Sequence, residues 1–179
     1  MPVEADWSRE LPLYLERGET PSTPSFKPKY AAVKISEIEV PTDEKNKWNV
    51  CDDNEISSWT SDGRVENAWI KLHFDRTARI AQVAVRFKDF RSTSYPIEIY
   101  AGDTLVWTGD TPKTLGDVYF DIPNPVDTET ITIRMKDTAK VKEAFASMTE
   151  LADKAAISTK ASVNKKMCIF EIEVKELRS

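Results

Sequence analysis

From Ala31 onward, hydrophobic and polar positions alternate over short stretches of the chain. Large apolar residues alternate with polar ones in Trp69–Phe74, and Ile80–Phe87 has much the same pattern. A period of two is typical of a strand with one buried face. About eight such stretches occur, each bounded by Asp, Asn, Gly or Pro: 33–40, 69–74, 80–87, 96–100, 105–107, 118–122, 130–135 and 168–174. Short strands at this spacing predict an antiparallel β-sandwich or barrel.

One segment, 138–156, follows a helical period instead. Its apolar residues recur in steps of three and four, at Val141, Phe145, Met148, Leu151 and Ala155. This spacing places them on one face of a helix. We therefore expect a single helical insert before the last strand.

The first 30 residues differ in composition from the rest of the chain. They are rich in Pro, Ser and Thr and show little periodicity, which is typical of an extended linker. Leu11, Leu13 and Tyr14 are too apolar for a freely solvated tail, so we expect this segment to dock onto this domain or a neighbouring one. The sequence predicts a linker or docking segment at 1–30 and one domain at 31–179.

The net charge of the chain bears on which kinds of partner it could bind. The chain has 179 residues and a net charge of -5, and such an acidic balance argues against a nucleic-acid partner. No apolar run approaches the roughly 20 residues that span a bilayer. The first residues have neither a basic nor an apolar region of the kind found in signal peptides.

The two cysteines, Cys51 and Cys168, are far apart in the sequence. The chain has no CxxC motif and a single histidine, so a zinc site is not expected. Two alternatives remain open: two free thiols, or one long-range disulfide.

Five segments, taken in order, resemble the discoidin family. These domains are also called coagulation-factor type C or galactose-binding-like domains, and many bacterial carbohydrate-binding modules belong to them. Asp52–Trp59 resembles the family's DGDxxTxW signature, and Trp69–Phe74 is similar to its W-I-x-V-D-L strand. The remaining three resemble later strands of the family: Ile80–Phe87, Tyr95–Tyr100 and Phe170–Val174.

The resemblance covers residues 31–179 and implies a jelly-roll β-sandwich of about eight strands. The sequence departs from the family pattern at three positions. Asp53 replaces the usual Gly, Ser57 the usual Thr, and His73 the usual Asp. The helical insert also has no usual counterpart, so these departures concern the loops more than the fold.

The resemblance also implies a structural calcium ion. Oxygen ligands at alternating positions of a tight turn can surround a hard cation, and the family commonly holds calcium in this loop. The expected ligands are Asp52, Asn54, Ser57 and, from the closing strand, Glu171. In the alternative interpretation, Asp52 and Asn54 only satisfy backbone groups of the turn. The family geometry also brings Cys51 and Cys168 near each other.

The tryptophans divide into two groups under the same resemblance. Trp59 and Trp69 match positions that are core in the family, whereas Trp48 lies in a polar loop. A tryptophan in a loop can stack on the apolar face of a sugar, and the family binds its ligands on loops at one end of the sandwich. The candidate carbohydrate-binding residues are Asn46, Trp48, Arg64 and Arg91.

The sequence shows no motif that indicates catalysis. His73 lies within a strand pattern, and the chain has no GxSxG nucleophile motif. We therefore expect a non-catalytic carbohydrate-binding module of a larger secreted enzyme that degrades polysaccharides, such as a glycoside hydrolase or a polysaccharide lyase. Its partners would be a glycan or polysaccharide and the linked catalytic domain, and its location secreted, periplasmic or at the cell surface. The alternative is a structural domain that packs on a catalytic neighbour without sugar affinity.

Overall fold

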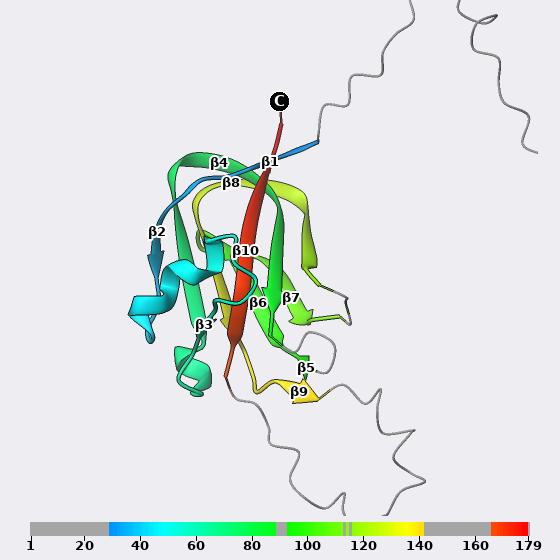
Figure 1. Ribbon diagram of the computed structural model, residues 1–179. Coiled ribbons are helices and arrows are strands. Elements are labelled where there is room, and N and C mark those ends of the chain that lie inside the picture. The colour runs from blue at the N-terminus through cyan, green and yellow to red at the C-terminus, as the bar shows by residue number, and fades with distance from the viewer. Residues whose placement is uncertain (1–28, 89–92, 113, 115, 142–165, 179) are drawn as a thin grey trace, which may run out of the picture.

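The computed structural model describes residues 29–88, 93–112, 114, 116–141 and 166–178 (Figure 1). Residues 1–28 of the expected linker, Arg91 and residues 142–156 of the expected helix lie outside this part of the chain. The described residues form an antiparallel β-sandwich, which confirms the predicted fold class.

The main sheet has eight strands in the order β1-β10-β4-β8-β6-β7, with β2 added beside β4 and β3 beside β10. A second sheet pairs β5 with β9. The strands are β1 (Tyr30–Ala32), β2 (Ile35–Glu39), β3 (Trp59–Thr60), β4 (Trp69–Phe87), β5 (Thr93–Ser94), β6 (Pro96–Ala101), β7 (Thr104–Asp110), β8 (Val118–Met135), β9 (Lys140–Val141) and β10 (Cys168–Leu177). Two 3-10 helices complete the described elements: η1 (Glu44–Cys51) and η2 (Val65–Asn67).

Strands β4 and β8 build both layers of the sandwich. Their ribbons arch over the end of the molecule near the C-terminus (Figure 1). The first half of β4 pairs with β2 and with the second half of β8, which continues the layer to β6 and β7. The second half of β4 pairs with β10 and with the first half of β8. The layer formed by β2, β4, β8, β6 and β7 is called here the β6 layer.

This arrangement corrects the predicted strand boundaries. The predicted strands 69–74 and 80–87 are one continuous strand, and so are 118–122 and 130–135. The polar residues that suggested breaks lie at the bend, where the β4–β8 register shifts. Pro123 and Pro125 fall between the paired residues Asp121 and Val126, where the ladder requires no backbone N–H from them.

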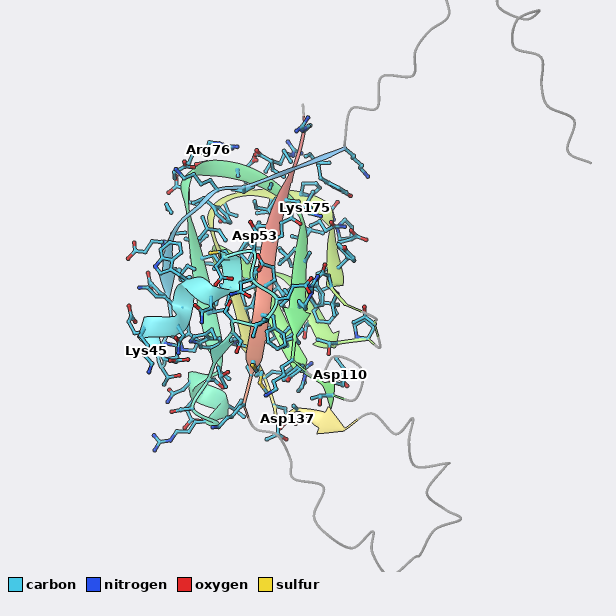
Figure 2. The ribbon with its side chains drawn as sticks, in the orientation of Figure 1. Lys45, Asp53, Arg76, Asp110, Asp137 and Lys175 are labelled. Atoms are coloured by element: carbon cyan, nitrogen blue, oxygen red, sulfur yellow. The ribbon has the colours of Figure 1, made fainter. Side chains whose placement is uncertain are left out.

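A salt bridge closes the bend against the last strand. The Arg76 guanidinium, at the arch of β4 in Figure 2, contacts both carboxylate oxygens of Glu176 on β10. This bidentate geometry fixes the relative position of the two side chains more tightly than a single contact would. The bend therefore holds β10 through side chains as well as through the sheet.

The core lies between the two layers and consists largely of the inward residues of the strands. Ile70 and Leu72 of β4 and Ile131 and Ile133 of β8 are fully buried, as the alternating pattern predicts. Trp59 is also fully buried, and its indole Nε1 donates a hydrogen bond to the Thr42 carbonyl oxygen at 2.8 Å. Its expected place in the core is therefore confirmed.

Two local predictions differ from the structure. The helix expected from Thr138 begins instead with β9 at Lys140–Val141, which pairs with β5, so the helical prediction is wrong for these two residues. The polar stretch before Cys51 forms helix η1, which the fully buried side chain of Val50 anchors to the core. Within the described residues, no helix has the length and apolar character needed to cross a bilayer.

Candidate functional site

The loop at 52–58, which joins η1 to β3, folds around its own polar side chains. Asp52 Oδ1 accepts a hydrogen bond from the Asn54 backbone N–H at 3.0 Å, and Asn54 Oδ1 accepts one from the Ile56 N–H at 3.1 Å. The Ser57 hydroxyl lies 2.7 Å from Asp52 Oδ2 and 3.1 Å from the Asn54 carbonyl oxygen. Asp53 adopts a left-handed conformation with φ 56°, at the position where the family has glycine. Three of the four expected calcium ligands therefore cluster in one turn.

Glu171, the fourth expected ligand, lies on β10 and lines the same groove as Asp53 of this loop. Burial raises its pKa from 4.5 to about 7, and the negative charges of Asp53 and Asp52 add to the effect. The thiol of Cys51 has a pKa raised to about 11, first by burial and then by the charges of Glu171, Asp52 and Asp53. The carboxyl groups of Asp52, Asp53 and Glu171 therefore form an acidic region beside the neutral Cys51 thiol.

One arginine offsets part of this charge. Arg86 of β4 donates from Nε to Asp117 at 2.8 Å and from Nη1 to Glu55 at 3.0 Å. Its positive charge lowers the pKa of Glu171, although burial and the neighbouring carboxylates outweigh it. The loop therefore has more acidic groups than cations to balance them.

The donor chemistry of this loop suits a hard cation, because a carboxylate oxygen of Asp52 and the carbonyl oxygen of Asn54 both lie within hydrogen-bond distance of the Ser57 hydroxyl. Among the residues that the structure describes, however, no three His, Cys, Asp or Glu side chains converge as a ligand set. A cation here would therefore depend on the Ser57 hydroxyl and on carbonyl oxygens as well as on the carboxylates.

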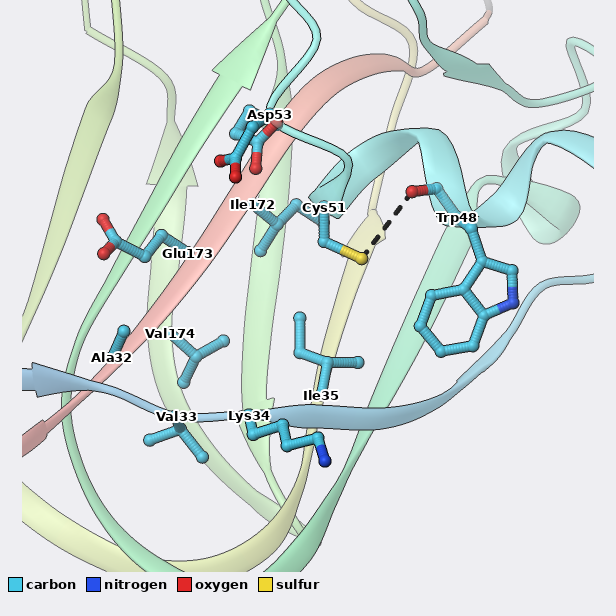
Figure 3. A pocket seen from close by; sticks show the side chains of 11 residues that line it. Ala32, Val33, Lys34, Ile35, Trp48, Cys51, Asp53, Ile172, Glu173 and Val174 are labelled. Carbon is cyan, nitrogen blue, oxygen red and sulfur yellow. Dashed lines mark hydrogen bonds between the residues drawn. The ribbon is translucent and has the colours of Figure 1, made fainter.

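A groove of about 520 Å³ runs beside this loop, between the chain that enters β2 and strand β10 (Figure 3). Trp48 forms one wall and is 45% exposed. Lys34 also lines the groove, and Asp53, Glu171 and Glu173 add carboxylates among largely apolar neighbours. This set, the Trp48 groove, offers an aromatic face together with hydrogen-bonding groups.

The other candidate carbohydrate-binding residues lie elsewhere. Asn46 is near the start of η1, and its amide Nδ2 donates to Asp43 Oδ1 at 2.7 Å. Arg64 is exposed and directly precedes η2, and neither residue lines the Trp48 groove. Arg91 lies outside the described residues. Of the three candidates within the described residues, only Trp48 lines this groove.

The cysteines are free thiols in this structure: Cys168 is buried and Cys51 is half-buried. Cys51 Sγ lies 3.7 Å from the Trp48 carbonyl oxygen, and Cys168 Sγ accepts a hydrogen bond from the Thr60 hydroxyl at 3.1 Å. Of the two alternatives left open by the sequence, the structure has the free thiols.

A second groove, of about 550 Å³, was missed by the sequence reasoning. It lies on the outer face of the β6 layer, beside η2, and its lining includes Trp69, Glu98 and Arg134. Trp69 is half-buried and points away from the core, since its neighbours Ile70 and Leu72 point inward. The expectation of a core position for Trp69 is therefore wrong. The sequence did contain a signal for this orientation. In the alternating pattern at the start of β4, Trp69 occupies a position that faces away from the buried residues.

Comparison with known proteins supports the fold. No protein-family model matches the chain, and no curated protein sequence matches it. Among solved structures, a truncated AlyQ with CBM32 and alginate lyase domains has a TM-score of 0.62 at 14% identity, covering 84% of this chain and 34% of the truncated AlyQ chain. The CBM32 of AlyQ in complex with 4,5-unsaturated mannuronic acid has a TM-score of 0.59 at 14% identity, covering 80% and 97%. The family 32 CBM of Clostridium perfringens NanJ in complex with galactose has a TM-score of 0.57 at 15% identity, covering 82% and 99%.

The chain thus spans about a third of the truncated AlyQ, and nearly the whole of the two single modules. At these identities the similarity shows the fold alone. The chain has the galactose-binding-like β-sandwich of the CBM32 modules, as the discoidin resemblance implied.

Proposed function

We propose that this chain is a non-catalytic carbohydrate-binding module. The observation that carries the proposal is the exposed Trp48 on a groove that also carries charged side chains, in a fold shared with modules solved in complex with sugars. An aromatic face packs against the C–H groups of a pyranose ring, and adjacent charged side chains bond its hydroxyls. In the Trp48 groove, Lys34 would donate to hydroxyl oxygens and Glu173 would accept from hydroxyl groups.

Asn46, Arg64 and Arg91 remain proposed carbohydrate contacts, with Asn46 and Arg64 outside the lining of the Trp48 groove. The Asn46 amide nitrogen is occupied by Asp43, which leaves its carbonyl oxygen to accept from a sugar hydroxyl. Arg64 is exposed and can present its planar donors to vicinal hydroxyls.

The proposed role is to hold a linked catalytic domain on its substrate. Tethering raises the effective concentration of a catalytic domain on a polysaccharide without any new contact at the active site. The parent protein would be a glycoside hydrolase or polysaccharide lyase that is secreted, periplasmic or at the cell surface. This proposal agrees with AlyQ, where a CBM32 domain and an alginate lyase domain share one chain.

We also propose that the loop at 52–58 binds calcium. Asp52, Asn54, Ser57 and Glu171 would hold the ion, which would supply positive charge to a region where the carboxylates outnumber the cations. Thermal unfolding with 1 mM calcium and with chelator tests this. An increase in Tm with calcium that is lost in Ser57→Ala supports the site, whereas equal Tm values in both buffers would refute it.

A glycan array run in calcium and again in chelator tests the carbohydrate proposal. Binding to a defined set of glycans is expected, and Trp48→Ala should abolish it while leaving the unfolding transition unchanged. Leu105→Ala is a matched control, because Leu105 is also 45% exposed but lies on β7, away from the groove. Retained binding by Trp48→Ala would reject this groove as the site.

A structural domain that packs on a catalytic neighbour is the second candidate. Ile56 favours it, since this side chain is 89% exposed in the loop before β3. An isolated exposed isoleucine is a weaker signal than a contiguous apolar patch. If the folded protein binds no glycan, self-association or binding to a catalytic domain that is lost in Ile56→Ser would favour this second function.

A further inference from the structure

The outer face of the β6 layer carries a row of side chains that cross four strands in register. Trp69 of β4 pairs with Arg134 of β8, Arg134 pairs with Glu98 of β6, and Glu98 pairs with Thr108 of β7. Because neighbouring strands lie about 4.8 Å apart, the row spans about 14 Å. This length exceeds a single pyranose ring, so the row offers more than one contact to a saccharide.

Arg134 is held in a fixed orientation within this row. Its Nε donates to Glu98 Oε2 at 2.8 Å, its Nη2 lies 2.7 Å from the same oxygen, and its guanidinium lies 5.0 Å from the centre of the Tyr100 ring. The Tyr100 hydroxyl donates to Glu98 Oε2 at 3.0 Å and accepts from Arg134 Nη2 at 3.1 Å. The hydrogen bond with Arg134 is the largest of the effects that lower the pKa of Glu98. The ion pair therefore persists as the pH falls toward the ordinary pKa range of a carboxyl group.

This network leaves two groups available to a ligand. Within the described residues, Arg134 Nη1 and Glu98 Oε1 have no hydrogen-bond partner, and the Arg134 side chain is 51% exposed. One group donates and the other accepts, which matches the needs of two adjacent sugar hydroxyls. The indole Nε1 of Trp69 likewise makes no hydrogen bond to the described part of the chain.

The groove over this row has the size and charge balance of a sugar site. Its volume of about 550 Å³ falls within the common range of about 300–1,000 Å³ for ligand pockets. Two acidic side chains, Glu66 and Glu98, balance two basic ones, Arg134 and Lys136, among its lining residues. A balanced charge favours a neutral ligand over an anionic one.

We propose that this groove is a second carbohydrate-binding site, in which a neutral pyranose stacks on Trp69 while Arg134 and Glu98 bond a vicinal pair of its hydroxyls. The site is separate from the Trp48 groove, whose lining residues it does not share. A module with two sites can hold two chains or two segments of one polysaccharide, which raises avidity beyond that of either site. This inference extends the proposed function but rests on its own residues.

Nuclear magnetic resonance can test both grooves in one titration. The chain has five tryptophans, so it gives five indole N–H signals, which Trp→Phe variants assign. Galactose and N-acetylgalactosamine are the probes, and we expect the Trp69 signal to shift saturably with at least one of them. The shift should persist in Trp48→Ala and in the control variant Trp107→Phe. The Trp107 ring packs against Phe120 of the core and is therefore not part of either groove.

Loss of the guanidinium should weaken this binding specifically. Arg134→Met should raise the Kd reported by the Trp69 signal at least tenfold, and Arg134→Lys, which keeps the charge but loses the planar fork, should do nearly the same. An unmoved Trp69 signal with both sugars, or an unchanged Kd in both variants of a folded protein, would overturn the second site. Galacturonic acid should bind no more tightly than galactose, and a tenfold preference for the acid would overturn the neutral ligand class.

The two tryptophan signals separate this inference from the proposed function. A response of Trp48 without Trp69 would reject the second site and leave the Trp48 groove in place. A response of Trp69 without Trp48 would support the second site and count against the Trp48 groove. If neither signal responds, the second site is rejected, and the glycan array decides the proposed function independently.

Discussion

Replacing Glu171 with glutamine should stabilise the calcium-free protein at high pH. Burial and the nearby charges of Asp53 and Asp52 raise the pKa of Glu171 from 4.5 to about 7, so the folded state holds a proton that the unfolded chain releases at lower pH. The free energy of unfolding therefore falls as the pH rises from about 4.5 to about 7, and the loss is complete above pH 7. Glutamine keeps the shape of the side chain and removes the charge.

The pKa shift gives the magnitude. A change from 4.5 to about 7 corresponds to at most about 3 kcal/mol. Glu171 is only partly buried, so solvent screening reduces the expected effect to about 1–2 kcal/mol. For a domain of this size, that is an increase in Tm of roughly 2–8 °C.

Urea unfolding in chelator at pH 5 and pH 8 measures the effect. Glu171→Gln should exceed the wild type in stability at pH 8, with much of the difference gone at pH 5. Glu173→Gln is the control on the same strand, because Glu173 makes a partly exposed ion pair with Lys175 worth less than about 1 kcal/mol. A variant that is less stable at pH 8, or equally affected at both pH values, would refute this account of the loop.

Three further predictions concern the core, a turn and the thiols. Ile133→Ala should lower the free energy of unfolding by about 2–5 kcal/mol in urea, since Ile133 is fully buried, and a loss below about 1 kcal/mol would contradict the described core. Gly102→Ala should cost about 1–2 kcal/mol because φ is +57° there, whereas Gly116→Ala, which meets no atom within 4 Å, should change the same measurement little; equal effects would contradict the turn geometry. Thiol titration in denaturant should count two free thiols, Cys51 and Cys168, and a count of zero would demonstrate the disulfide that the structure lacks.

Much of the fold could be predicted because alternation acts locally. Nearly all inward positions of β4 and β8, such as Ile70 and Ile133, are apolar, and an apolar residue on a half-buried strand has only one favourable face. The ordered motifs of the discoidin resemblance added the sandwich. The predicted strand boundaries at the bend were wrong. A gap in the β4–β8 ladder accommodates the polar residues and prolines there, and only the pairing of these two strands reveals that gap.

The candidate site was predicted less completely. The clustering of Asp52, Asn54 and Ser57 follows from their spacing within one turn, so the sequence could indicate it. The groove at Trp48 depends on how η1 packs beside β10, and these segments are more than 100 residues apart in the chain. Spacing along a sequence carries no information about such a contact.

By itself, then, the sequence determined the strand period, the all-β class and the polar composition of the loop at 52–58. These properties depend on interactions between residues a few positions apart. Only the tertiary structure decided that Trp69 lies on the outer face beside Arg134 and Glu98, and that Arg64 is not part of the lining of the Trp48 groove. Register between distant strands sets these neighbours, and register results from the packing of the whole core.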